Sequence, residues 1–110
     1  MKLPNGDRAI IPLKKLTGYC LNPDHPKGKH KARLFKAVLG ITIDHVDYLY
    51  ALVQRSAVEG DIVQQSTTNF GEEYKLDWLI PDTGGVELRT LWIVESESDT
   101  PRLVSAFIKS

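Results

Sequence analysis

The spacing of hydrophobic residues changes abruptly at Gly60, and this change restricts the chain to a mixed fold. Up to that point apolar residues recur every three or four positions, as in Val46, Leu49 and Val53, which is the spacing of an amphipathic helix. Beyond it apolar and polar residues alternate, which is typical of strands with one buried face. We therefore predict an α+β fold in which three helices precede a four-stranded antiparallel meander.

Turn-forming residues divide the first half of the chain into its helices. One short amphipathic helix is predicted over residues 12–20, beginning with a proline, and its apolar stripe includes Tyr19. A second is predicted over about residues 29–39, with Gly40 as its left-handed stop. The third begins after Thr42 as the capping residue and ends at Gly60.

The second half alternates in four segments that we predict to be strands. They cover residues 62–70, 74–80, 86–94 and 102–108, and residues 81–85 form a hairpin loop rich in glycine. The chain has 110 residues and shows no repeat or linker. This length supports one modest core, so residues 1–110 are predicted to be a single domain.

The charge composition excludes a strong attraction of the whole molecule to nucleic acid or membrane. Fourteen Lys and Arg residues balance fourteen Asp and Glu residues, although basic residues dominate from Lys14 to Lys36, where Asp24 is the only acid. Cys20 is the single cysteine, so no internal disulfide forms. Because the N-terminus has no apolar signal sequence and no segment has the length to span a bilayer, we expect a cytoplasmic protein without a membrane partner.

Residues 24–35 combine two histidines with four cationic side chains, and no other part of the chain has so many candidate catalytic side chains close together. Phe35, Val38 and Leu39 form the predicted buried stripe of this helix. Lys31 lies four residues before Phe35 and is therefore predicted to point along the same stripe. His30 lies near the boundary of that stripe. The other cationic residues of the helix point to solvent: Lys29, Arg33 and Lys36.

This pattern is suited to binding or cleaving a phosphodiester without a metal or cofactor. Such cleavage of RNA requires a base, an acid and a cation that stabilises the charge developing on phosphorus. A histidine can take the proton roles near neutral pH, and lysine or arginine the electrostatic role. The candidate catalytic residues are His25, His30, Lys31, Arg33 and, from the sheet, Arg89 and Ser105. The candidate nucleic-acid-binding residues are Lys27, Lys29, Lys36 and Arg102.

Other interpretations of these residues remain open. The cluster is also what a solvated helix face preceded by a capping loop looks like. Asp24, His25 and His30 lack the tight spacing and cysteines of zinc sites, and no metal site is predicted. Cys20 on an apolar helical face is typical of a small core residue rather than a nucleophile. The alternating aromatic residues of the sheet are expected in the core rather than on a base-stacking surface: Tyr74, Trp78 and Trp92.

Several motifs resemble a family of small uncharacterised bacterial domains that also occur as modules in polymorphic toxins. They are L-P-N-G-D-R-A at residues 3–9, then Lys15-Leu16 and Tyr19, H-P-x-G-x-H-K-A-R-x-F at residues 25–35, and the terminal segments 92–94 and 101–104. The resemblance covers nearly the whole chain. It implies a fold similar to the barnase–EndoU–colicin–RelE type of ribonuclease, in which an early helix and the sheet supply the catalytic groups. Ser105 stands where the family pattern leads us to expect threonine, which keeps a hydroxyl group.

The leading hypothesis is therefore a metal-independent endoribonuclease of toxin type, with RNA as substrate and a cognate inhibitor protein as partner. The alternative is a non-catalytic module that binds a protein or nucleic acid through its basic face or an exposed sheet edge. A third reading is a structural subunit with a large apolar patch. The sequence leaves the oligomeric state open.

Overall fold

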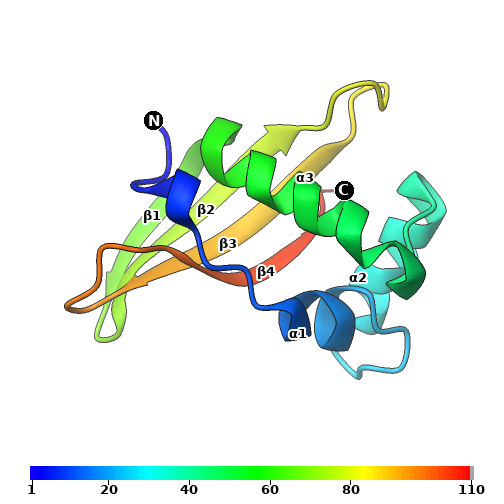
Figure 1. The fold of residues 1–110 in the computed structure, drawn as a ribbon, viewed down its shortest axis with the longest axis horizontal. Coiled ribbons are helices and arrows are strands. Elements are labelled where there is room, and N and C mark those ends of the chain that lie inside the picture. The colour runs from blue at the N-terminus through cyan, green and yellow to red at the C-terminus, as the bar shows by residue number, and fades with distance from the viewer. Residues whose placement is uncertain (110) are drawn as a thin grey trace.

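The computed structural model of the chain describes residues 1–109 and confirms the predicted order of helices followed by an antiparallel sheet (Figure 1). The strands follow one another in space as they do in sequence, each antiparallel to its neighbour. They are β1 (Asp61–Thr68), β2 (Gly71–Leu79), β3 (Glu87–Glu95) and β4 (Arg102–Ile108). The sheet is thus a meander in which β1 and β4 form the two edges.

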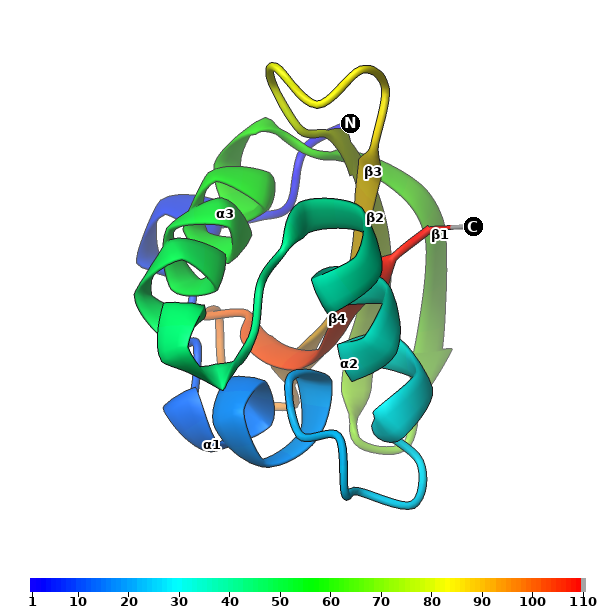
Figure 2. The same cartoon turned by 90° about the vertical axis from the view of Figure 1, so that its right-hand side faces the viewer.

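The helices of the first half lie against one face of the sheet and around the β4 edge. The long helix α3 (Val46–Glu59) crosses the sheet, whereas the two short helices gather beside β4 (Figures 1 and 2). The short helices are α1 (Leu13–Lys15), extended by a π-helical turn at Leu16–Cys20, and α2 (Lys29–Leu34), extended by a π-helical turn at Phe35–Leu39. Single 3₁₀ turns occur at Gly6–Arg8 and at Ile43–His45.

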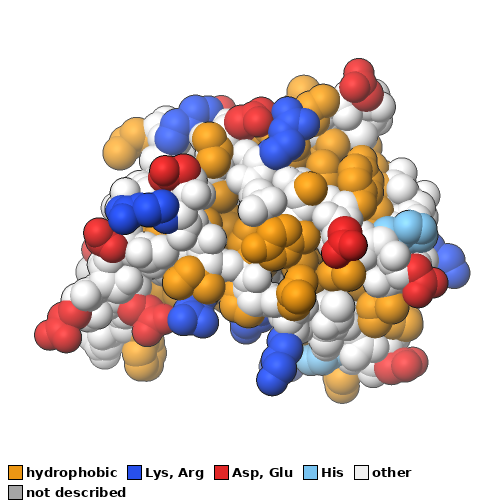
Figure 3. All heavy atoms as spheres, in the orientation of Figure 1, with side chains coloured by type: hydrophobic (Ala, Val, Ile, Leu, Met, Phe, Trp, Pro, Cys, Tyr) orange, Lys and Arg blue, Asp and Glu red, His pale blue; other side chains and the backbone are white. Residues whose placement is uncertain are grey.

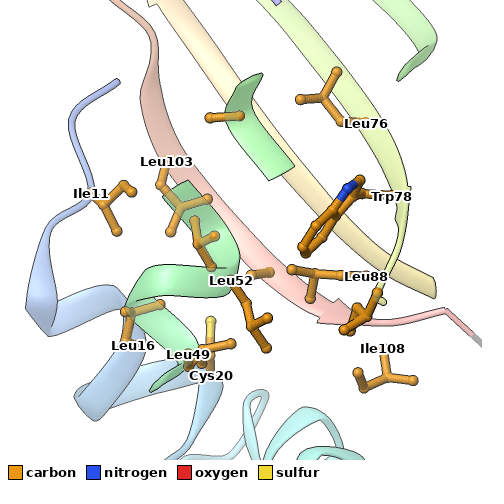
Figure 4. Packing of buried hydrophobic residues seen from close by; sticks show 14 of the residues in the cluster. Ile11, Leu16, Cys20, Leu49, Leu52, Leu76, Trp78, Leu88, Leu103 and Ile108 are labelled. Carbon is orange, nitrogen blue, oxygen red and sulfur yellow. The ribbon is translucent and has the colours of Figure 1, made fainter. Parts of the chain in front are cut away.

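The core fills the space between α3, the short helices and the sheet (Figure 4). Tyr74, Trp78 and Trp92 are buried in it as the alternation of the strands predicts. The indole Nε1 of Trp92 donates to the Thr90 hydroxyl at 2.8 Å, so this polar pair is satisfied inside the core. Fully buried residues of the helical half complete it: Leu16, Cys20, Phe35, Leu49, Val53 and Ala57.

The ends of the helices match their predicted signals, but one buried position does not. Gly40 has a φ of 68° and stops the second helix, and Thr42 caps the third helix through a reciprocal pair with His45. Val38, predicted on the buried stripe, is 44% exposed. The wider hydrogen-bond spacing of the π-helical turn shifts the phase of the residues after Phe35, so Val38 rotates out of the stripe. The first strand also begins and ends slightly earlier than predicted, at Asp61 and Thr68.

The surface carries charges of both signs, interspersed with apolar side chains, on the face shown in Figure 3. This agrees with the balanced composition and leaves no single-sign field over that face. No helix within residues 1–109 has the length and apolar character needed to cross a membrane.

Candidate functional site

His25 organises the loop that leads into α2. Its ring Nδ1 accepts the backbone N–H groups of Lys27 at 3.0 Å and Gly28 at 2.9 Å, and its carbonyl accepts the N–H of Lys29 at 3.0 Å. An Nδ1 that accepts two hydrogen bonds carries no proton, so the proton of the neutral ring is on Nε2. His25 therefore fixes the entry to the helix in the way a capping side chain does.

Gly28 brings this loop into direct contact with the π-helical turn at Leu16–Cys20. A Cβ at this position would lie 2.2 Å from the carbonyl oxygen of Tyr19, closer than any real contact allows. The backbone of Gly28 is in the ordinary helical region, so the glycine is required by the close approach rather than by its dihedral angles. In the same place the His25 ring packs edge-on against the Tyr19 ring, with centroids 4.8 Å apart.

Lys31 points inward from α2, as its spacing predicts, and meets Tyr19 and Phe107. Its Nζ donates to the Tyr19 hydroxyl at 2.6 Å and lies 4.5 Å from the centroid of the same ring. The Phe107 centroid on β4 is 5.3 Å away. Within residues 1–109 no acidic side chain lies within 4 Å of this half-buried ammonium group. The Lys31 ammonium group is thus held by one tyrosine hydroxyl and two aromatic rings.

The opposite, solvent-facing side of α2 borders a groove of about 800 Å³ between the helix and residues 41–44. Its basic rim consists of Lys29, His30, Arg33 and Lys36, all exposed. The other polar residues that line it are Asn22, Asp24, Thr42 and Asp44. Its apolar lining includes Leu21, Ala32 and Ile41. Two separate surfaces therefore flank the helix, one centred on Lys31 and one on Arg33.

His30 differs from the other histidines in that neither of its ring nitrogens has a hydrogen-bond partner among residues 1–109. His25 Nδ1 is occupied by two backbone amides, and His45 Nδ1 accepts the N–H of Thr42 at 3.1 Å. Within the described part of the chain, no hydrogen bond engages the His30 ring, which is exposed at the groove. No three His, Cys, Asp or Glu side chains among residues 1–109 converge as a metal site.

Arg89 lies on the face of the sheet that is turned away from α3, beside Phe107 in the register of β3 and β4. Its Nε and Nη2 bind the two oxygens of Asp77 at 2.7 and 2.9 Å, and Lys109 Nζ lies 3.1 Å from the same carboxylate. The Arg89 guanidinium holds the pKa of Asp77 below its usual value, and Asp77 in turn raises the pKa of Arg89. Arg89 is thus close to the Lys31 surface, but its charge is already paired.

The other predicted sheet residues, Arg102 and Ser105, both lie on β4. Arg102 is exposed at the start of β4, where its Nε is 3.5 Å from Glu95. Ser105 is only 5% exposed and lies beside the thiol of Cys20, whose pKa is raised by burial. Neither residue lines the basic groove, and Lys27 is exposed in the loop before α2. His25 and Lys31 therefore both contact Tyr19, and Lys31 also lies near Phe107, which pairs with Arg89. The predicted residues do not all line one cleft.

Nearly the entire chain matches one protein family. Residues 2–110 match the family described as a domain of unknown function, DUF6883. The chain belongs to this family. No curated protein matches this DUF6883 chain.

A solved structure shares the fold of the DUF6883 chain. It is a chain of the contact-dependent growth inhibition toxin–immunity protein complex from Klebsiella pneumoniae 342. The two superpose with a TM-score of 0.65 over 96% of this chain and 97% of that chain, at 14% sequence identity. At this identity the likeness concerns the fold, and the complex contains both a toxin and an immunity protein.

Tyr19 was not among the predicted site residues of this DUF6883 chain, because its spacing assigned it to the apolar stripe of the first helix. A half-buried tyrosine hydroxyl requires a hydrogen-bond partner, and Lys31 supplies it. A tyrosine near a basic motif without a neighbouring acid is the signal that could have identified it.

Proposed function

We propose that this DUF6883 chain is a metal-independent endoribonuclease of toxin type in which Lys31 binds the reacting phosphate. The observation that carries this proposal is the half-buried Lys31 ammonium, held by Tyr19 and Phe107 without an acidic partner in residues 1–109. An ammonium group with no carboxylate partner has N–H donors left for a phosphate. The shared fold with a chain of a toxin–immunity complex supports the toxin type.

In this proposal Lys31 and Tyr19 act together on the phosphodiester. The RNA 2′-oxygen attacks phosphorus and forms a new P–O bond, while the bond from phosphorus to the 5′-oxygen breaks. An ammonium group has three N–H donors, so Lys31 keeps two for the phosphate oxygens while one binds Tyr19. Tyr19 gives its hydroxyl proton to the leaving 5′-oxygen, and the N–H from Lys31 stabilises the phenolate that remains.

His30 is the proposed base that removes the proton from the 2′-hydroxyl. His30 and Lys31 are neighbours in α2 and are separated by about 100° around its axis, so the proposal requires the RNA to pass over the first turn of the helix to contact both residues. Arg33 then contributes charge on the side of His30. His25 acts as a positioning residue that holds Tyr19, and Arg89 positions Phe107 through its pair with Asp77.

The test is incubation of total RNA with the purified protein in EDTA. Wild type and the variant Lys31→Met are compared with Lys14→Met. This control removes one positive charge, as Lys31→Met does, but at an exposed lysine of α1. Methionine keeps the apolar stem of Lys31, so circular dichroism should show an unchanged fold. We expect cleavage by wild type and Lys14→Met and a loss of at least about 100-fold in Lys31→Met, the size typical of an electrostatic catalytic group. Equal cleavage by all three proteins would refute the assignment of Lys31.

A second candidate function is an immunity-type binding partner, since the similar chain comes from a complex that contains both kinds of protein. This candidate predicts a stable complex with a toxin and no turnover of RNA. Wild-type protein that leaves RNA intact in the same assay, but protects cells that produce a cognate toxin, would favour it.

A further inference from the structure

The groove on the outer side of α2 is separate from the Lys31 surface and has its own chemistry. We propose that it is a nucleotide subsite, which holds one unstacked nucleotide of single-stranded RNA next to the cleaved phosphate. This inference rests on the proposed ribonuclease function and names the form of RNA that the site accepts.

The floor of the groove is apolar and suits the face of a nucleobase. Leu21, Ala32 and Ile41 lie beneath it with little exposed surface, and Ile43, which is 45% exposed, supplies apolar surface that a base can contact. The volume of about 800 Å³ falls within the range of ligand-binding pockets, which is roughly 300–1,000 Å³. An aromatic base can therefore lie on the floor, where it would be removed from water.

The rim carries the charges that a nucleotide requires. Lys29, Arg33 and Lys36 stand along one side, and no acidic side chain of residues 1–109 lies within 4 Å of their charged nitrogens. These three cations face phosphate oxygens in the proposal. Asp24 and Asp44 also line the groove, so its charge is three minus two, or +1.

The two carboxylates favour RNA over an acidic peptide as the occupant. A carboxylate accepts hydrogen bonds from the amino groups of bases, as Asp and Glu do from cytosine N4. An acidic peptide would bring carboxylates beside Asp24 and Asp44, which offer them no donor, whereas a base brings amino groups from which these carboxylates accept hydrogen bonds. The combination of apolar floor, cationic side and carboxylates therefore matches a base with its phosphates.

The floor also selects unpaired RNA. In a duplex the faces of the bases are covered by their stacked neighbours, so they cannot reach an apolar surface inside a groove. A nucleotide in a single strand or loop can turn its base into the groove while its phosphates follow the basic rim.

The experiment measures binding rather than cleavage, so that it does not depend on the catalytic mechanism. Fluorescence anisotropy follows a labelled ten-nucleotide single-stranded RNA, with Lys31→Met protein to keep the probe intact. The groove variant adds Arg33→Glu and Lys36→Glu. The matched control adds Lys14→Glu and Lys15→Glu, which reverse two exposed charges on α1.

We expect the groove variant to bind the probe at least about 10-fold more weakly and the control variant to bind it nearly as well as the parent. Loss of two phosphate contacts should also lower the slope of log affinity against log salt by about 1.4. A duplex of the same length should bind the parent more weakly than the single strand does. Equal weakening by both double variants, or equal binding of duplex and single strand, would overturn the subsite. If wild type cleaves no RNA but the groove variant alone loses binding, the ribonuclease proposal fails and the subsite stands.

Discussion

Replacement of Gly28 by alanine tests whether the loop of residues 22–28 positions the candidate site. The added Cβ would lie 2.2 Å from the Tyr19 carbonyl oxygen and 3.0 Å from the Tyr19 carbonyl carbon. Both atoms belong to the backbone, so they cannot move aside as a flexible side chain would. The loop and the turn that carries Tyr19 must therefore separate.

The expected cost follows from the contacts that this separation disturbs. Two backbone N–H groups donate to His25 Nδ1, and each such hydrogen bond contributes roughly 0.5–1.5 kcal/mol. Overpacking of a close contact costs a similar total of about 1–3 kcal/mol. We expect Gly28→Ala to lower the free energy of unfolding by about 2 kcal/mol and the Tm by roughly 8 °C. RNA cleavage should fall as well, because the displacement moves Tyr19 away from Lys31.

Urea unfolding followed by circular dichroism measures this effect, with Gly18→Ala as the matched control. Gly18 lies in the same π-helical turn, but a Cβ there would meet nothing within 4 Å. Alanine at this position should leave stability unchanged or raise it by up to about 1 kcal/mol. If Gly28→Ala were as stable as Gly18→Ala, the proposed contact between the loop and Tyr19 would be wrong.

Two further predictions concern the sheet and the core. Arg89→Ala should destabilise the protein by about 1–3 kcal/mol at pH 7, because Asp77 is only 8% exposed and loses its main partner. Arg89 holds the pKa of Asp77 below its usual value, so its contribution to stability is present above about pH 4 and is lost as the pH falls through the lowered pKa. The free energies of unfolding of wild type and variant, measured in urea, should therefore converge near pH 2. An unchanged difference at that pH would contradict the pairing. Phe35→Ala should cost about 3–5 kcal/mol in the same assay, whereas Val38→Ala, at a 44% exposed position, should cost less than about 0.5 kcal/mol. Equal costs would contradict the rotation of the π-helical turn.

Local patterns predicted the elements well because each pattern reports a nearby physical cause. Gly60 ends the helical period and begins the strand period, and the structure ends α3 and begins β1 there. The four-residue spacing from Lys31 to Phe35 was enough to predict that Lys31 points inward. The burial of Val38 was predicted wrongly because a regular helix period does not include a π-helical turn.

The candidate site was harder to predict because it depends on contacts between elements. Lys31 and Tyr19 are 12 residues apart, and only the fold of the intervening loop brings them together. Arg89 pairs with Asp77 through the register of two strands, and Ser105 is buried by the packing of the short helices on β4. A sequence pattern marks the residue types, but the partners of each side chain follow from tertiary packing.

The most direct test of the account is the single-turnover rate at which Lys31→Met cleaves a labelled RNA in EDTA, relative to wild type. Wild type should cleave the RNA without a metal, and a folded Lys31→Met protein should cleave it at least about 100-fold more slowly. Wild-type protein without cleavage, or a variant that cleaves at the wild-type rate, would contradict it.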